Sequence, residues 1–150
     1  MALELSNIQK TFGDHKAVDS ININVPSGSM YGFLGGNGAG KTTTFRMILQ
    51  LLTPSEGTIL YDGDKIGYHM TNKIGYLPEE RGLHPKLTVK EQVIYLAELK
   101  GMSKKEANEA LDYWLDRFKV TENKVKKIEK LSKGNQQKIQ LIASIIHNPE

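Results

Sequence analysis

The sequence contains no cysteine, which excludes disulfide bonds, thiolate metal sites and thiol catalysis. It also lacks an apolar stretch near the length of about 18 residues that spans a bilayer, because the longest one, residues 139–146, is interrupted by Gln140 and Ser144. The chain does not start with a basic segment leading into an apolar one, so we expect no secretory signal. An excess of one charge sign is missing too, since 20 basic and 17 acidic residues leave a net charge of +3. This balance permits nucleic acid or anionic lipid as a partner without requiring either.

What is present suits a folded domain. The 150 residues match the length of about one ordinary domain, and the hydrophobic share of 39% is enough to build a core. Glycine is unevenly placed, because six of the 14 glycines fall between Gly28 and Gly40. Backbone freedom and close approach are therefore needed there more than side chains.

Hydrophobic periodicity predicts a mixed α/β fold. Residues 3–6 and 21–25 alternate at a period of two, which is typical of half-buried strands and predicts an antiparallel edge region. Residues 30–34 form an apolar run that predicts a strand buried on both faces, followed by a glycine-rich loop and a helix over 43–52. Further strands are predicted at 59–61 and 74–77, and further helices at about 88–100, 103–118 and 134–147.

One of these predicted helices, 103–118, carries an apolar stripe at helical spacing. We interpret the stripe as core packing and not as a ligand site. Its members are Ala107, Leu111, Trp114 and Phe118.

The glycine-rich loop matches a phosphate-binding pattern. Residues 35–42 fit G-x-x-x-x-G-K-[ST] without a mismatch, and they lie between a predicted strand and a predicted helix. Consecutive backbone N–H groups can curl around phosphate oxygens only where bulky Cβ atoms are absent. Lys41 is then placed to reach the β- and γ-phosphates, and the Thr42 hydroxyl can hold Mg²⁺. The predicted nucleotide-binding residues of this segment are Gly35, Gly36, Asn37, Gly38, Ala39, Gly40, Lys41, Thr42 and Thr43.

Three stretches outside the loop carry a resemblance to a known family. Phe12 precedes a Gly-Asp turn, residues 76–79 read Tyr-Leu-Pro-Glu, and residues 131–137 read Leu-Ser-Lys-Gly-Asn-Gln-Gln. In this order around the phosphate loop, they resemble the ATP-binding cassette (ABC) ATPases over the whole chain. The residues in these stretches are most similar to those of the bacterial exporter branch that includes sodium-extrusion and antibiotic-resistance ATPases.

The resemblance implies a role for single residues. Phe12 occupies the position of the aromatic that stacks on adenine, and Val18 falls where the family adds an apolar contact to the base. Glu79 stands in place of the Q-loop glutamine, which helps to hold the metal and the attacking water. It is therefore the candidate catalytic residue, and with Thr42 a candidate metal ligand. A carboxylate can ligate Mg²⁺ but cannot donate a hydrogen bond when it is ionised.

The stretch at 131–137 looks like the family's signature, usually Leu-Ser-Gly-Gly-Gln. Lys133 replaces a glycine and Asn135 replaces the glutamine. In the family these residues grip the γ-phosphate bound by a second copy of the domain, so the resemblance implies a head-to-tail dimer. The residues assigned to this contact are Ser132, Lys133, Gly134, Asn135 and Gln136.

The resemblance implies an α/β fold with a P-loop NTPase (RecA-like) core, an antiparallel β edge region and an inserted helical subdomain. We expect residues 1–83 to form the core and β region, about 84–135 the helical subdomain, and 136–150 a return helix. The strand that ends in an aspartate and a glutamate in the family is absent from the sequence. We therefore expect a truncated domain that does not hydrolyse ATP alone. An exposed apolar side on helix 134–147, with marginal stability or self-association, should follow.

The implied function is that of an ATP-binding subunit, with ATP and Mg²⁺ as cofactors. Its ATP-driven dimerisation would drive export through a separate membrane-spanning permease, with the subunit cytoplasmic and peripheral on the inner face of the cell membrane. The alternative is a soluble ABC-type ATPase acting on nucleic acid or ribosomes, to which the lysine-rich residues 124–133 could point. The lack of interleaved aromatic residues in that segment argues against nucleic acid. A small P-loop kinase or GTPase does not account for residues 131–137.

Overall fold

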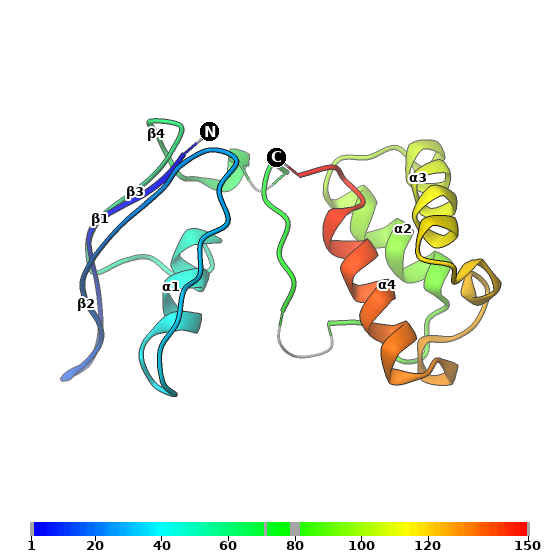
Figure 1. The fold of residues 1–150 in the computed structure, drawn as a ribbon, viewed down its shortest axis with the longest axis horizontal. Helices are drawn as coiled ribbons and strands as arrows, with labels where there is room; N and C mark the ends of the chain where they lie inside the picture. The colour runs from blue at the N-terminus through cyan, green and yellow to red at the C-terminus, as the bar shows by residue number, and fades with distance from the viewer. Residues whose placement is uncertain (1, 71, 79–81, 150) are drawn as a thin grey trace. The chain divides into compact units, whose positions relative to one another are not determined.

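The computed structural model describes residues 2–70, 72–78 and 82–149. They form two compact units, Met1–Met70 and Thr71–Glu150 (Figure 1). The first unit contains the sheet and the phosphate loop, and the second is helical. The division falls at residue 70, whereas the sequence placed the end of the core and β region at residue 83. The predicted assignment of 1–83 to the core and β region, of about 84–135 to a helical subdomain and of 136–150 to a return helix stays a prediction.

An antiparallel sheet of four strands makes up most of the first unit. The strands are β1 (Leu3–Phe12), β2 (His15–Val25), β3 (Glu56–Tyr61) and β4 (Asp64–Lys65), in the order β2-β1-β3-β4. Strands β1 and β2 form a hairpin whose turn includes Gly13 at a φ of 56°. Leu5, Ile8, Val18 and Ile59 are almost fully buried, and a register shift separates Leu5 from Ile8 along β1. The predicted antiparallel region is thus confirmed.

Helix α1 (Lys41–Ile48) follows the glycine-rich loop and buries Thr44 and Met47. It begins two residues earlier and ends four residues earlier than the sequence predicted. The chain turns at Gln50, which has a φ of 58°, and the N–H groups of Leu51 and Leu52 both donate to the Arg46 carbonyl. These two bonds end the helix because they occupy the Arg46 carbonyl, which would otherwise accept the helical i to i+4 bond.

Two predicted strands, 30–34 and 74–77, are wrong as secondary structure. Neither segment is a strand, and in the first one the side chains of Met30 and Leu34 are almost fully exposed. A doubly buried strand needs hydrogen-bonded neighbours. Within the described ranges 2–70, 72–78 and 82–149, no strand pairs with either segment. Apolar pattern alone therefore predicted strands whose pairing partners are not found.

Three helices dominate the second unit: α2 (Val89–Leu99), α3 (Lys104–Arg117) and α4 (Lys133–Ile145). Helices α2 and α3 both start at complete capping boxes, Thr88 with Glu91 and Ser103 with Glu106. The chain between α3 and α4 contains 3₁₀ turns at Thr121–Asn123 and Ile128–Lys130. Local sequence signals thus placed all three helices within two residues of their ends.

The helices share one core. The stripe on α3 packs as predicted, with Ala107 and Leu111 fully buried and Trp114 and Phe118 partly buried against the cluster. The prediction that the apolar side of α4 would be exposed is wrong. Its Ile139, Ile142 and Ile146 are fully or almost fully buried, because α4 packs against α2 and α3.

None of the helices within the described ranges combines the length and the apolar character needed to cross a membrane.

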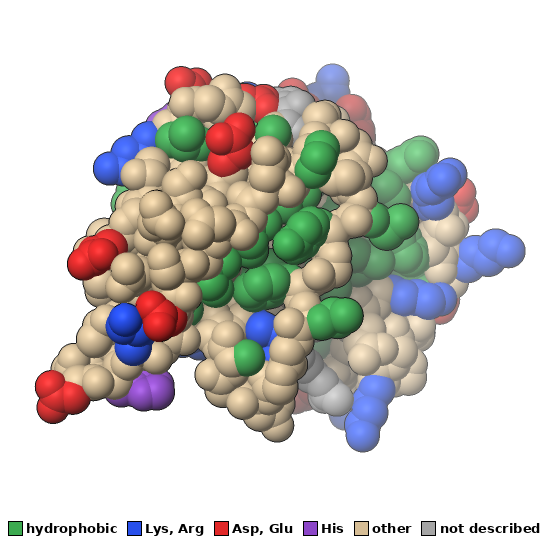
Figure 2. All heavy atoms as spheres, turned by 60° about the vertical axis from the view of Figure 1, so that its left-hand side comes forward, with side chains coloured by type: hydrophobic (Ala, Val, Ile, Leu, Met, Phe, Trp, Pro, Cys, Tyr) green, Lys and Arg blue, Asp and Glu red, His purple; other side chains and the backbone are tan. Residues whose placement is uncertain are grey.

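Hydrophobic side chains gather into a patch on the face shown in Figure 2. In the first unit, the large apolar side chains that are at least two-fifths exposed are Phe12, Met30, Tyr31, Leu34, Phe45, Leu51 and Tyr68.

Candidate nucleotide-binding site

The loop at 35–42 has the backbone that a phosphate cradle requires. Gly38 and Gly40 have φ values of 79° and 78°, in the left-handed region that favours glycine. A Cβ atom built at Gly36 or Gly38 would meet no atom within 4 Å, so open space lies beside both backbones. Curled backbone next to open space can receive an anion at its N–H groups. The structure therefore supports the predicted phosphate-binding shape of this segment.

The end of the loop packs tightly against strand β2. At Gly40 a Cβ atom would lie 2.4 Å from the Ala17 carbonyl oxygen and 2.9 Å from Cγ2 of Val18. Val18 is almost fully buried. The structure thus brings Val18, predicted to contact the base, directly beside the end of the phosphate loop.

Lys41 folds back over the loop from the first residue of α1. Its Nζ donates to the carbonyl oxygens of Gly35, at 2.6 Å, and Gly36, at 2.7 Å. Two neutral carbonyls orient the ammonium group but do not neutralise its charge, and no carboxylate in the described part of the chain pairs with it. An uncompensated cation at a helix N-terminus is suited to a polyphosphate.

Three threonines follow Lys41, and the side chains of Thr42 and Thr44 serve different purposes. Thr42 is exposed in the first turn of α1, so its hydroxyl oxygen is available as a hard ligand for Mg²⁺. Thr44 is buried, and its hydroxyl donates to the Gly40 carbonyl at 2.9 Å. Sequence reasoning missed Thr44, although its i to i−4 spacing from the last glycine is a recognisable signal.

Phe12 lies at the end of β1 with 49% of its side chain exposed. The Nζ of Lys10 stands over the ring, 5.2 Å from the centroid, and donates to the Thr53 carbonyl at 2.8 Å. The ring is thus held on one side and remains accessible, which suits stacking on a base. The contact with Lys10 was not predicted from the sequence.

Residues 132–136 begin α4 in the second unit. Ser132 is the N-cap, and its Oγ accepts from the Asn135 N–H at 3.3 Å. Gln136 turns its amide back to donate to the carbonyls of Ile128 and Leu131, so this side chain supports the preceding turn. Ser132, Lys133 and Gly134 are exposed and form the accessible part of the predicted signature.

The predicted Q-loop residue Glu79 lies outside the described residues, so its metal-binding and catalytic roles stay predictions. Its neighbour Pro78 accepts a hydrogen bond from the buried Gln140 amide at 3.0 Å. Gln140 also borders a hollow of about 430 Å³ in the second unit. The other lining residues are Leu83, Pro85, Ile128, Glu129 and Gln136.

The chain is similar to known ATP-binding proteins of ABC transporters. The family model described as "ABC transporter" matches residues 18–150. The chain is 57% identical over 148 residues to an uncharacterized ABC transporter ATP-binding protein, YhaQ, of Bacillus subtilis, covering 99% of this chain and 50% of the relative. It is 36% identical to the bacitracin transport ATP-binding protein BcrA of Bacillus licheniformis, covering 99% of this chain and 48% of the relative. The chain spans about half the length of these curated relatives.

A solved structure supports the fold. It is titled as the dimeric structure of MJ0796, a bacterial ABC transporter cassette, and superposes with a TM-score of 0.84 at 26% identity. The match covers 98% of this chain and 70% of that one. The predicted α/β fold class, with an antiparallel sheet and a helical part, is confirmed by this similarity and by the arrangement of the strands and helices.

Proposed function

Because this chain belongs to the ABC transporter family of ATP-binding proteins, we propose that it binds Mg-ATP as part of a transporter's ATP-binding subunit. The single observation that carries the proposal is the placement of Lys41. Its ammonium group lies over the glycine-rich loop at the start of α1 and donates to two carbonyl oxygens. Among the residues that the structure describes, no carboxylate pairs with it. A triphosphate would supply the missing negative charge.

Different residues would contact different parts of the nucleotide. Backbone N–H groups of 36–42 and the Lys41 ammonium would hold the phosphates, and the Thr42 hydroxyl would hold Mg²⁺ with Glu79. Phe12 would stack on the adenine, and Val18 would add an apolar contact beside it. Support comes from the exposure of Phe12 and Thr42. Val18 lies beside Gly40 but is almost fully buried, so its contact with the base rests on the family resemblance alone.

We further propose that two subunits associate head to tail around ATP. The exposed start of α4, Ser132–Gly134, would contact the phosphates held by residues 35–42 of the other subunit. The N-terminus of a helix without acidic residues in its first turn favours such an anion, and α4 has none there. The dimeric state named for the similar solved cassette supports this arrangement.

The partner in transport would be a separate membrane-spanning permease, with the ATP-binding subunit at the inner face of the cell membrane. The name of the bacitracin transport relative supports a transport role for the whole protein. Within it, residues 1–83 would belong to the nucleotide-binding core, about 84–135 to the helical subdomain, and 136–150 would return to the core.

Hydrolysis is proposed for the whole protein and not for these 150 residues. The sequence contains no strand ending in adjacent aspartate and glutamate, which the family uses to anchor Mg²⁺ and activate water. The chain should therefore bind nucleotide without turning it over.

The alternative function, action on nucleic acid or ribosomes, gains no structural support. Lys124 forms an ion pair with Asp112, and Lys126 donates to the Asn123 side chain at 3.0 Å. Part of the lysine-rich link is thus engaged within the helical unit.

Isothermal titration of the 150-residue chain with Mg-ATP tests the proposal. Lys41→Ala should weaken binding at least tenfold, because a charge-assisted contact to phosphate contributes about 1.5–3 kcal/mol. The matched control is Lys65→Ala, which removes an exposed lysine from β4 of the same unit. Equal affinities for wild type and Lys41→Ala would overturn the phosphate site.

A further inference from the structure

We propose that Lys10 is a positioning residue for base recognition, because its ammonium group covers one face of the Phe12 ring and leaves the other to the adenine. This inference deepens the proposed nucleotide site and rests on the assignment of Phe12 as its stacking residue. It assigns a function to a lysine that lies outside every motif of the sequence.

The contact between Lys10 and Phe12 follows from strand geometry. Residues two apart on a strand point to the same face, so the two side chains lie side by side along β1. The Lys10 Nζ stands 5.2 Å from the ring centroid, which is within the range of a cation–π interaction. Phe12 is half exposed, and the ammonium group on one face of its ring restricts where the ring can move.

The ammonium group is itself anchored. It donates to the Thr53 carbonyl at 2.8 Å, in the loop that joins α1 to β3. A lysine side chain alone is a flexible stem with a mobile charge. Anchoring one of its three donors to a fixed carbonyl sets where the charge stands above the ring.

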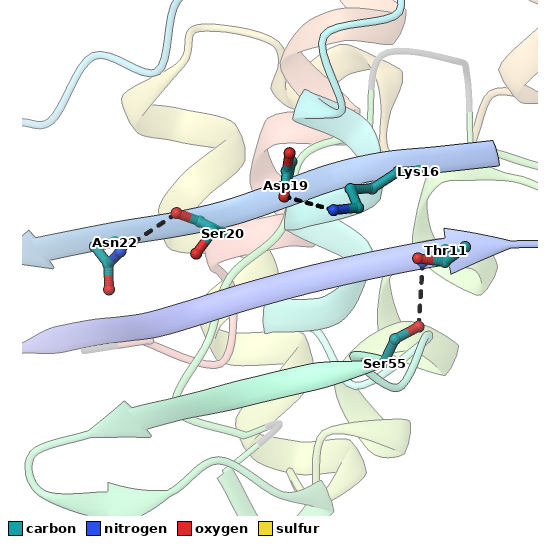
Figure 3. Close-up of polar contacts among 6 residues, drawn as sticks. All are labelled: Thr11, Lys16, Asp19, Ser20, Asn22 and Ser55. Carbon is teal, nitrogen blue, oxygen red and sulfur yellow. Dashed lines mark hydrogen bonds and ion pairs between the residues drawn. The ribbon is translucent and has the colours of Figure 1, made fainter. Parts of the chain in front are cut away.

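The same loop is tied to β1 at two further points. The Ser55 N–H donates to the Gln9 carbonyl at 2.8 Å, and the Thr11 N–H donates to Ser55 Oγ at 3.1 Å. Figure 3 shows the second of these contacts, with Thr11 at the end of its strand and Ser55 on the neighbouring segment. Because α1 starts at the phosphate loop, this short segment connects the helix that faces the phosphates to the strand that carries Phe12.

Fixing the ring before binding lowers the entropic cost of stacking. A cation–π contact at an exposed site contributes about 0.5–1 kcal/mol, which corresponds to about a two- to fivefold change in affinity. Only the part of the affinity that depends on the base should change. If Lys10 only linked β1 to the loop, its replacement would change the stability of the chain or its affinity for phosphate instead.

The experiment compares Mg-ATP with Mg-tripolyphosphate, which lacks the base, by isothermal titration of the 150-residue chain. The variants are Lys10→Met, Lys10→Arg, Phe12→Ala and the double variant Lys10→Met/Phe12→Ala. Lys16→Met is the matched control, since Lys16 lies opposite Thr11 in the same hairpin, and its Nζ pairs with Asp19 at 3.0 Å (Figure 3).

Lys10→Met should weaken Mg-ATP binding about two- to fivefold and leave tripolyphosphate binding unchanged. Lys10→Arg should restore wild-type affinity, because a guanidinium also stacks on an aromatic face. Lys16→Met should have no effect. In the Phe12→Ala background, Lys10→Met should cause no further loss, since the two residues act through one ring.

The outcomes separate the two proposals. If wild type does not bind Mg-ATP, or Phe12→Ala leaves the difference between the two ligands unchanged, the proposed base site fails. If Phe12→Ala lowers that difference and Lys10→Met does not, only the inference on Lys10 fails. It is also overturned if Lys10→Met weakens both ligands equally, or if it strengthens Mg-ATP binding, which would mean that lysine and adenine compete for the ring.

Discussion

A Cβ atom at Gly40 would lie 2.4 Å from the carbonyl oxygen of Ala17, so the last glycine of the phosphate loop touches the backbone of β2. Gly40 is also the N-cap of α1, with a φ of 78°. One residue therefore fixes the loop against the sheet and caps the start of α1. Its neighbours Gly36 and Gly38 border open space instead. The loop thus contains one glycine required for packing and others available for ligand approach.

The first prediction distinguishes the glycine required for packing from a glycine that leaves room for a ligand. Gly40→Ala should lower the free energy of unfolding by about 1–3 kcal/mol, because the methyl group meets a carbonyl and the φ is unfavourable for alanine. Gly36→Ala, the matched control, should leave unfolding unchanged and weaken Mg-ATP binding, since its methyl group would occupy the open cradle. Urea unfolding and titration of both variants provide the check. A wild-type unfolding midpoint for Gly40→Ala would contradict the packing argument.

The second prediction concerns the start of α4. Ser132 Oγ caps this helix, and aspartate is an equally good N-cap. Ser132→Asp should therefore keep the unfolding midpoint while its negative charge prevents contact with a partner's γ-phosphate. Ser132→Ala should instead cost about 1 kcal/mol of stability.

Sedimentation with and without Mg-ATP tests this separation. Wild type should associate in the presence of nucleotide, and Ser132→Asp should remain in its nucleotide-free state at the same concentration. If Ser132→Asp associates as well as wild type does, residues 132–134 do not contact the second nucleotide site.

The third prediction tests the core of the helical unit. Leu111→Ala should lower the free energy of unfolding of this unit by about 2–5 kcal/mol, because the side chain is fully buried among α2, α3 and α4. Leu99→Ala is the control on α2, where the side chain is 64% exposed, and it should change stability by no more than about 0.5 kcal/mol. Urea unfolding monitored at Trp114, which packs against this core, provides the measurement. Similar midpoints for the two variants would be inconsistent with one shared core.

The fourth prediction is a pH dependence from His147. Burial lowers the pKa of this imidazole, the nearby Lys100 charge lowers it further, and a hydrogen bond with the Ile74 carbonyl opposes both. The unfolded chain therefore takes up the proton first as pH falls. The stability due to neutral His147 is complete above the ordinary histidine pKa of about 6.5 and is lost as pH falls through the lower, folded pKa.

The check is the difference in unfolding midpoint between wild type and His147→Gln. The difference should be constant above about pH 7 and should change in favour of the variant as the pH falls below about 6.5. A difference that does not vary with pH would show that His147 titrates alike in both states.

Local signals predicted much of the structure. The capping boxes at Thr88 and Ser103 depend only on neighbouring residues, and α2 and α3 begin directly after these two residues. The glycine pattern of residues 35–42 is also local, and the positive φ values of Gly38 and Gly40 agree with the predicted curl of the backbone. The contact of this loop with phosphate stays a prediction. The segments 30–34 and 74–77 were wrongly predicted as strands because pairing depends on distant residues, which an apolar run does not specify.

Tertiary contacts account for what was missed at the site. The bond from Lys10 to Thr53 joins residues 43 positions apart, and no sequence pattern indicates it. The close approach of Gly40 to Ala17 likewise depends on how the loop meets β2. The buried face of α4 was also missed, because its burial requires α2 and α3 to pack beside it.

Hydrogen exchange of the 150-residue chain, measured with and without Mg-ATP, tests the central claim most directly. Phosphate oxygens that accept from the loop should slow exchange of the backbone amides in residues 36–42. Lys41→Ala should lose most of this protection, whereas Lys65→Ala should retain it. Binding of Mg-ATP that leaves residues 36–42 unprotected would contradict the assignment of this loop as the nucleotide site.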